Sequence, residues 1–178
     1  MNYLKIDKGD VSNGIGIGVV LWVAGCSCHC KNCHNQSAWD FNAGQPFTDN
    51  TMQELLHALD KPYISHLTLS GGHPLDPKNL DDVYKIICTI RNEYPNKSIW
   101  LYTGYTWEEI LEQDKLYKDL ETNAISPLDV VKLCDVLVDG RYEDNKRDIS
   151  LAWRGSTNQR VINIKESLKQ GKVDLYCE

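Results

Sequence analysis

The chain has 178 residues and a formal net charge of -6 at pH 7. At this length we expect one domain, residues 1–178, whose core buries roughly 70 per cent of the surface that the unfolded chain exposes. The acidic balance argues against a broad nucleic-acid-binding face, because such a face neutralises phosphates with clustered Lys and Arg. Protein and small-molecule partners are therefore favoured.

The start of the chain and its apolar runs predict neither secretion nor a membrane partner. The opening "MNYLKIDKGD" lacks the basic start and apolar centre of a secretory signal. The apolar run at residues 19–24 is far shorter than the roughly 20 residues of a membrane-spanning helix. Clustered cysteines would also form strained bridges under oxidising conditions, so a reducing cytoplasm is the expected location.

Strands and helices are predicted to alternate along the chain. Residues 18–25 are continuously apolar and rich in β-branched side chains, which is typical of a strand covered on both faces. Helix starts are predicted by Thr51 with Glu54, Asp76 with Pro77, Thr106 with Glu109, and Ser126 with Pro127. The polar residues 113–126 are interpreted as a loop insertion. The predicted elements are strands at 18–25, 64–70, 98–102, 134–140, 160–164 and 172–176, and helices after residues 51, 76, 106 and 126.

This order predicts an α/β fold with a mostly parallel sheet, open or partly closed into a barrel. In such folds the chemistry gathers at the carboxyl ends of the strands. The unusual residues of this chain follow predicted strands, and they are the cysteine loop, Gly71-Gly72-His73, Thr103-Gly104-Tyr105 and Asp139-Gly140-Arg141. We therefore expect these segments to share one edge of the sheet.

Four of the seven cysteines lie within eight positions. Cys26, Cys30 and Cys33 have the spacing Cys-x-x-x-Cys-x-x-Cys, and Cys28 is an extra thiol in the longer gap. Thiolates this close favour zinc or an iron–sulfur cluster over hard cations. A structural zinc site usually takes two separated pairs of ligands. No second pair occurs elsewhere, so zinc would have to use Cys28, His29 or His34.

Three cysteines leave one iron of a cubane cluster with an open position, as in a catalytic metal site. This spacing after a strand resembles the signature loop of the radical S-adenosylmethionine superfamily. The resemblance implies a partial (βα) barrel with one [4Fe-4S] cluster and S-adenosyl-L-methionine as cofactors. It further implies that the methionine moiety chelates the open iron, and that one electron cleaves the sulfonium to give a 5'-deoxyadenosyl radical. Such a site must exclude water and oxygen.

Further motifs narrow the resemblance, from residue 1 to about residue 160. They are "NGIG", "NQSAW" with "FNAGQPF", "SGGHPL", "LYTGY", "VLVDGRY" and "WRGSTNQR". Together they resemble the family that activates the anaerobic ribonucleoside-triphosphate reductase. The resemblance implies an oxidoreductase that removes hydrogen from a glycine near the carboxyl terminus of that reductase and leaves a glycyl radical. Its implied partners are the reductase and an electron donor such as reduced flavodoxin.

The resemblance also implies roles for single residues. Cys26, Cys30 and Cys33 match the cluster ligands and form the catalytic centre. Asn32 and His34 flank the cofactor, and Thr103 and Tyr105 line its adenosine side. Gly71 and Gly72 match the turn that receives the methionine amine, where the lack of a Cβ permits close approach. Candidates for the site or for docking, without assigned roles, are Asp139, Arg141, Trp153, Arg154, Ser156, Asn158 and Gln159.

Three positions depart from the family pattern. His34 stands where an aromatic residue is usual, and Ile15 replaces a usual proline. His73 replaces a usual acidic residue, and a neutral imidazole accepts from the methionine ammonium in only one tautomer. Cys28 is interpreted as a spectator thiol, because family members commonly lack a thiol there.

Two alternatives remain open. The chain could activate another glycyl-radical enzyme of the formate lyase type, although the "WRGSTNQ" segment argues against this. It could instead be a zinc-binding interaction module without chemistry, which metal and sulfide analysis would distinguish.

Overall fold

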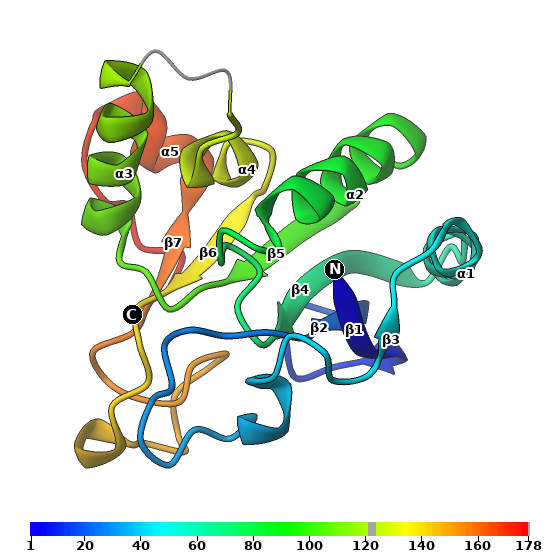
Figure 1. Cartoon of the computed structure of the whole chain (residues 1–178), viewed down its shortest axis with the longest axis horizontal. Helices are drawn as coiled ribbons and strands as arrows, with labels where there is room; N and C mark the ends of the chain where they lie inside the picture. The colour runs from blue at the N-terminus through cyan, green and yellow to red at the C-terminus, as the bar shows by residue number, and fades with distance from the viewer. Residues whose placement is uncertain (121–123, 178) are drawn as a thin grey trace.

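A computed structural model of the chain describes residues 1–120 and 124–177. In this part of the chain seven strands form one sheet in the order β3-β1-β2-β4-β5-β6-β7 (Figure 1). The strands are β1 (Asn2–Asp10), β2 (Ile17–Val23), β3 (Gln45–Pro46), β4 (Ile64–Gly71), β5 (Ser98–Tyr102), β6 (Val136–Asp139) and β7 (Arg160–Asn163). The helices are α1 (Asp49–Leu59), α2 (Leu80–Glu93), α3 (Trp107–Asp119), α4 (Pro127–Val131) and α5 (Ile164–Gln170).

The centre of the sheet is parallel and its edges are antiparallel. Strands β2, β4, β5 and β6 pair in parallel, whereas β1 runs antiparallel to β2 and β7 runs antiparallel to β6. Helices connect the parallel strands, as right-handed crossovers require. The predicted α/β fold with a mostly parallel sheet is confirmed, and it is consistent with a partial barrel.

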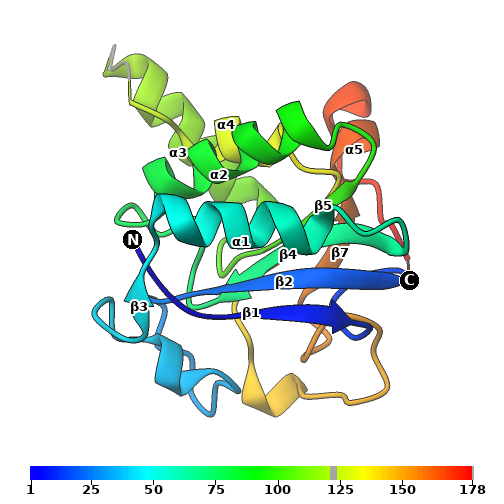
Figure 2. The same ribbon diagram turned by 90° about the vertical axis from the view of Figure 1, so that its right-hand side faces the viewer.

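The helices cover one face of the sheet, and long loops cover the other (Figure 2). Leu67 and Leu69 of β4 belong to the main core cluster under the helices. The intervening His66, Thr68 and Ser70 are also buried, and they belong to the opposite face because strand side chains alternate. Residues 24–44 and 140–159 pass over that second face. The second face is therefore the inner wall of the partial barrel.

Several local predictions were wrong by a few residues. Helix α1 begins earlier, because Thr48 caps it in a box with Thr51. Helix α2 is preceded by Asn79 rather than by Asp76, whose carboxylate instead binds the cysteine loop. The capping residues predicted for α3 and α4 are confirmed.

Three predictions about segments are corrected by the structure. Strand β1 was not predicted, and residues 172–176 contribute a single bridge between Ile162 and Leu175 rather than a strand. Residues 113–119 belong to α3 and not to a loop insertion. Asp114 stabilises this end of the helix by accepting hydrogen bonds from Lys118 and Ser126. Residues 121–123 of the proposed insertion lie outside the described residues.

Among the described helices, none combines the length and the apolar composition that crossing a membrane would require.

Candidate functional site

The cysteine loop leaves the carboxyl end of β2 and is held by backbone hydrogen bonds. The amide of Gly25 donates to Ala38 at 2.8 Å, and the amide of Cys26 donates to Trp39 at 3.1 Å. Within the loop His29 and Asn32 adopt positive φ angles of 45° and 55°. These left-handed residues bend the chain tightly, so that all four thiols of the loop stay at the end of the parallel strands.

Backbone amides surround the three cysteines of the predicted ligand set. The Cys26 sulfur accepts from the amides of Cys28 and His29, and the Cys30 sulfur accepts from the amide of Tyr142. The Cys33 sulfur accepts from the amide of Asn35 at 3.4 Å. N–H donors stabilise thiolates and tune iron–sulfur clusters. The residues present therefore fit a cluster held by three thiolates.

Cys28 has a different environment. Its sulfur lies 3.9 Å from Nδ1 of His73 and packs against Gly104, where an added Cβ would come within 2.5 Å of it. A side-chain hydrogen bond from Cys28 is the largest cause that lowers the pKa of Cys26 to about 6. The same hydrogen bond and burial raise the pKa of Cys28 itself. In the cluster-free protein, the directions of the two pKa shifts favour a thiolate at Cys26 and a protonated thiol at Cys28.

A zinc ion is not supported by this geometry. A tetrahedral ion needs all its ligands about 2.0–2.3 Å from one point. In residues 1–120 and 124–177 no three His, Cys, Asp or Glu side chains form a group that could hold one metal ion. Each thiolate of a cubane binds a different iron, so cluster ligands need not converge on one point.

His73 is buried in the turn that follows β4, with 1% of its surface exposed. Its Nε2 lies 2.8 Å from the Thr103 hydroxyl, and its ring contacts Tyr105 edge-on at 4.5 Å between centroids. Burial lowers the pKa of His73 to about 4, so the imidazole is neutral at pH 7. The structure thus brings His73, Thr103 and Tyr105 together beside Cys28.

Gly71 and Gly72 allow close approach between two strand ends. A Cβ on Gly71, which has a φ of 104°, would lie 2.6 Å from the Val23 carbonyl oxygen. A Cβ on Gly72 would lie 2.4 Å from the Gly25 carbonyl oxygen. The amide of Gly72 also donates to Val23 at 2.8 Å. Packing of Gly71 against β2 and of Gly72 against the cysteine loop is therefore sufficient reason for both glycines, and their predicted contact with the cofactor stays a prediction.

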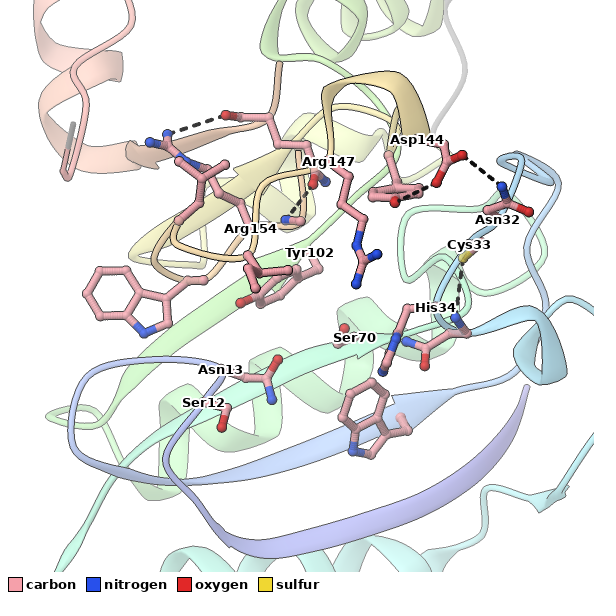
Figure 3. A pocket seen from close by; sticks show the side chains of 18 residues that line it. Ser12, Asn13, Asn32, Cys33, His34, Ser70, Tyr102, Asp144, Arg147 and Arg154 are labelled. Carbon is pink, nitrogen blue, oxygen red and sulfur yellow. Dashed lines mark hydrogen bonds between the residues drawn. The ribbon is translucent and has the colours of Figure 1, made fainter. Parts of the chain in front are cut away.

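A cavity of about 800 Å³ opens beside the cysteine loop on the inner face of the sheet (Figure 3). Asn32, Cys33 and His34 line it, whereas Gly71, Gly72, Thr103 and Tyr105 do not. The predicted site residues therefore fall into two groups on either side of the loop. Lining residues to which the sequence analysis assigned no role include Ser12, Asn13, Trp22, Ser70, Tyr102 and Arg147. Asn13, Ser70 and Tyr102 lie in the quoted motifs but were given no role. The period of two in the strands was the signal that could have placed Trp22, Ser70 and Tyr102 on this face.

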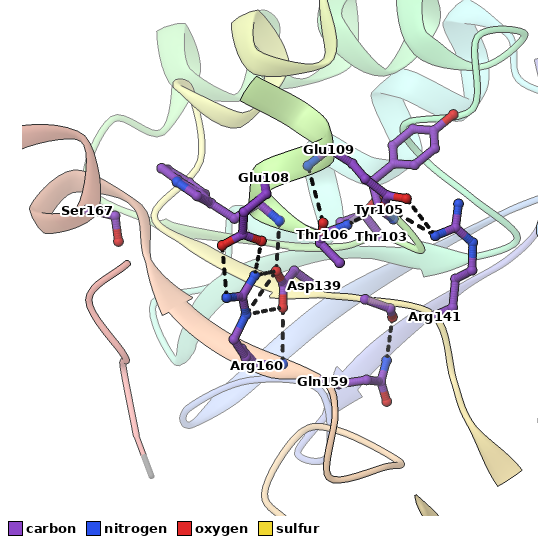
Figure 4. A network of polar contacts seen from close by, with 12 residues as sticks. Thr103, Tyr105, Thr106, Glu108, Glu109, Asp139, Arg141, Gln159, Arg160 and Ser167 are labelled. Atoms are coloured by element: carbon purple, nitrogen blue, oxygen red, sulfur yellow. Dashed lines mark hydrogen bonds and ion pairs between the residues drawn. The ribbon is translucent and has the colours of Figure 1, made fainter. Parts of the chain in front are cut away.

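Asp139 has a structural role at the end of β6 (Figure 4). Its carboxylate, 1% exposed, accepts from the Trp107 amide at 2.8 Å and from the Arg160 guanidinium at 2.5 Å. Arg160 also pairs with Glu108 at 2.7 Å. The network joins the start of α3 to β6 and β7.

The other candidates to which the sequence analysis assigned no role stabilise the loops around the cavity. Asn158 donates to the Arg141 carbonyl at 2.8 Å, and Gln159 donates to the Gly140 carbonyl at 3.0 Å. Ser156 is fully buried, and its hydroxyl accepts from the Glu143 amide at 3.2 Å. The Arg141 guanidinium pairs with Glu109 at 2.9 Å. The "WRGSTNQ" segment therefore shapes the wall of the site.

Trp153 and Arg154 occupy different surroundings although they are neighbours in sequence. Trp153 packs edge-on against Trp100, with 5.1 Å between ring centroids. Arg154 lines the cavity and donates weakly to the Gln159 carbonyl at 3.4 Å. Both residues therefore line the cavity, Trp153 with an indole packed on Trp100 and Arg154 with a guanidinium turned to the Gln159 carbonyl.

The fold and the three-cysteine loop define a class of iron–sulfur protein, and comparison with known proteins agrees. Residues 12–162 match a family model described as a 4Fe-4S single cluster domain. The predicted [4Fe-4S] cofactor is thereby confirmed, and the zinc alternative is not supported.

Similar proteins narrow the class to one family. The chain is 42% identical to the anaerobic ribonucleoside-triphosphate reductase-activating protein of Enterobacteria phage T4, over 90% of this chain and 93% of the relative. It is 39% identical to the protein of that name from Escherichia coli (strain K12), over 93% of this chain and 100% of the relative. A relative from Pasteurella multocida is 38% identical over 93% of this chain and 99% of its own length. The chain belongs to the family of anaerobic ribonucleoside-triphosphate reductase-activating proteins.

Proposed function

We propose that this protein generates the glycyl radical of the anaerobic ribonucleoside-triphosphate reductase, with a [4Fe-4S] cluster held by Cys26, Cys30 and Cys33. The observation that carries the proposal is the set of backbone N–H groups directed at these three sulfurs. The Cys28 sulfur instead lies 3.9 Å from Nδ1 of His73 and packs against Gly104. The ligand set is therefore three thiolates, which leave one iron open.

The bound cofactors supply reductive cleavage of S-adenosyl-L-methionine and a carbon radical that takes a hydrogen atom. The chain supplies position and shielding. Asn32 ties the cysteine loop to the segment that covers the cavity, because its amide donates to Asp144 at 2.8 Å. Neutral His73 and Thr103 fix the turn beside the loop through their 2.8 Å contact. We propose that Asn32, His34, Gly71, Gly72, Thr103 and Tyr105 surround the cofactor.

The proposal includes an electron donor and a compartment. Cleavage of the sulfonium consumes one electron, and a reduced flavodoxin or a similar protein is the proposed source. All seven cysteines are free thiols, and an exposed cluster loop requires reducing surroundings. We therefore propose that the protein works in the cytoplasm.

The test is anaerobic reconstitution with iron and sulfide, followed by addition of S-adenosyl-L-methionine and a strong reductant. The parent protein is expected to form 5'-deoxyadenosine, and the Cys30→Ala variant is not. The Cys28→Ala variant serves as the matched control, since it removes a thiol of the same loop that is not a proposed ligand. Loss of the cluster in Cys28→Ala together with retention in Cys30→Ala would reverse the ligand assignment.

Activation assays with several purified glycyl-radical enzymes test the choice of partner. We expect a radical on the anaerobic ribonucleotide reductase and none on a formate lyase. The reverse result would support the alternative activase.

A further inference from the structure

Two residues that depart from the family pattern lie in contact with each other. Cys28 is the extra thiol of the cysteine loop, and His73 stands where an acidic residue is usual. The Cys28 sulfur lies 3.9 Å from Nδ1 of His73, although the two residues are 45 positions apart in sequence. The fourth thiol of the loop therefore has a partner outside the loop.

Cys28 borders the proposed cluster site. Its side chain is hydrogen-bonded to that of Cys26, which is a proposed cluster ligand. A cubane cluster normally takes four cysteine ligands, one on each iron. A fourth thiolate from the loop would occupy the iron that must stay open for S-adenosyl-L-methionine. The chain therefore needs a feature that keeps Cys28 away from this iron.

His73 is fixed on several sides and presents Nδ1 to Cys28 at a defined place. Its Nε2 lies 2.8 Å from the Thr103 hydroxyl, and its amide donates to the Gly25 carbonyl at 2.8 Å. The Asn79 side chain donates to the His73 carbonyl at 3.1 Å. The residue is 1% exposed, and close packing of the interior restricts rotation of a buried ring.

Gly104 provides the space that the Cys28 sulfur occupies. An added Cβ at Gly104 would lie 2.5 Å from this sulfur and 3.6 Å from the Cβ of Cys28. The next nearest atom, Cγ of Arg141, would be 3.7 Å away, which is ordinary van der Waals contact. A methyl group at this position would therefore displace the sulfur and little else.

We propose that His73 and Gly104 keep Cys28 out of the coordination sphere of the cluster, so that four neighbouring thiols still leave one iron open. This inference rests on the proposed function and deepens it by assigning a task to each residue. Both are positioning residues that act through the Cys28 sulfur. His73 holds the sulfur through Nδ1, and Gly104 leaves room for it there.

The test displaces the sulfur from its place. Gly104→Ala is loaded with the cluster without oxygen, and binding of radiolabelled S-adenosyl-L-methionine is measured by equilibrium dialysis in the absence of reductant. The displaced thiolate of Cys28 is expected to occupy the open iron. The Kd should rise about tenfold, which corresponds to an open iron in about one molecule in ten. Cluster-loaded Cys28→Ala is expected to bind as tightly as the parent.

The double variant Gly104→Ala/Cys28→Ala is the matched control. Without the thiol, the added methyl group displaces no sulfur, so the Kd should return to that of the parent. A merely structural role of Gly104 would leave the double variant as weak as Gly104→Ala. Electron paramagnetic resonance of the reduced cluster gives a second readout. At a concentration that just saturates the parent, S-adenosyl-L-methionine should change the spectra of the parent and the double variant far more than that of Gly104→Ala.

His73→Ala, alone and combined with Cys28→Ala, gives the same comparison and decides the question if Gly104→Ala does not fold. Removal of the imidazole frees the sulfur, so the single variant should bind S-adenosyl-L-methionine more weakly than the parent. Loss of the thiol in the double variant should restore binding.

Two results would overturn the inference. In one, Gly104→Ala and His73→Ala bind S-adenosyl-L-methionine as tightly as the parent. In the other, both bind it more weakly and removal of Cys28 restores neither. Because this binding requires no electron, the experiment is decided separately from the radical assay. A parent that binds S-adenosyl-L-methionine but makes no radical would contradict the proposed function and leave this inference standing.

Discussion

The Ser27 hydroxyl donates a hydrogen bond of 2.6 Å to the Asp76 carboxylate, and the Ser27 amide donates to the same oxygen at 3.2 Å. Asp76 is 2% exposed and lies three residues after His73, whereas Ser27 lies between Cys26 and Cys28. This contact ties the cysteine loop to the turn that follows β4. The loop is therefore held in place before any cluster binds.

We expect Asp76→Asn to release the cluster about tenfold faster than the parent protein. Hydrogen bonds to a charged acceptor contribute about 1.5–3 kcal/mol. An Asn oxygen that accepts from both Ser27 donors turns its NH2 group toward the Lys78 amide, which donates to the other Asp76 oxygen at 3.2 Å. The rate is measured from the decay of cluster absorbance in the presence of an iron chelator. Asp81→Asn, an exposed carboxylate on α2, is the control. Equal decay rates in Asp76→Asn and in the parent would show that the contact does not hold the loop.

Gly72→Ala is expected to lower the free energy of unfolding by about 3 kcal/mol, because overpacking against rigid backbone is costly. Its Cβ would lie 2.4 Å from the Gly25 carbonyl oxygen and 2.9 Å from that of Ala38. Gly171→Ala is the matched control, since a Cβ there meets nothing within 4 Å and only the φ of 68° is strained.

The control is expected to cost about 1 kcal/mol. Urea unfolding of the two variants measures the difference, and equal losses would contradict a packing role for Gly72.

Arg160→Gln is expected to destabilise the protein by about 2–3 kcal/mol, because it leaves the buried Asp139 carboxylate without its cation. Glu108→Gln removes the other carboxylate on the same guanidinium and is expected to cost about 0.5 kcal/mol. The Glu108 side chain is 62% exposed, so water already screens this pair. Thermal unfolding of both variants checks the order. A larger loss of stability in Glu108→Gln than in Arg160→Gln would mean that the network depends on the exposed pair of Arg160 and Glu108.

The unfolding free energy should fall as pH drops below about 6.5. His66 is fully buried, and burial lowers its pKa although Asp10 and the Ile15 backbone oppose the shift. The unfolded chain therefore binds more protons than the folded chain below the ordinary pKa of histidine. Stability from neutral His66 is complete above that pH and is lost as the pH falls.

His66→Phe keeps a ring over Gly14 and Gly18, which the imidazole contacts, and it removes the proton. Urea unfolding at about pH 7.5 and about pH 5.5 should show a smaller pH dependence in this variant than in the parent. His57→Gln on α1 serves as the control. An unchanged pH dependence in His66→Phe would assign the effect to another group.

Local signals predicted the parallel centre of the fold, and long-range contacts decided the rest. The apolar run at β2 and the capping pair Thr106 and Glu109 were sufficient because each depends on neighbouring residues. Asp76 was mistaken for a helix cap because its partner, Ser27, lies 49 positions away in sequence. Strand β1 was missed because its burial is partial and its pairing with β2 includes register shifts.

The candidate site likewise contains residues that local spacing predicted and residues that only long-range contacts bring together. Spacing alone selected Cys26, Cys30 and Cys33, and their amide donors agree with that choice. Arg147 could not be found in this manner, since no quoted motif contains it and only the fold brings it to the cavity; Tyr102 lies in the "LYTGY" motif, but the motif did not show which face of β5 it occupies.

The most direct measurement is the fate of deuterium placed on the glycine residues of the reductase. The cluster-loaded protein, S-adenosyl-L-methionine and a reductant are mixed with labelled reductase, and the 5'-deoxyadenosine is analysed by mass spectrometry. We expect deuterium in the 5'-deoxyadenosine together with a glycyl radical signal on the reductase. Unlabelled 5'-deoxyadenosine and no radical, from protein with an intact cluster, would contradict the account.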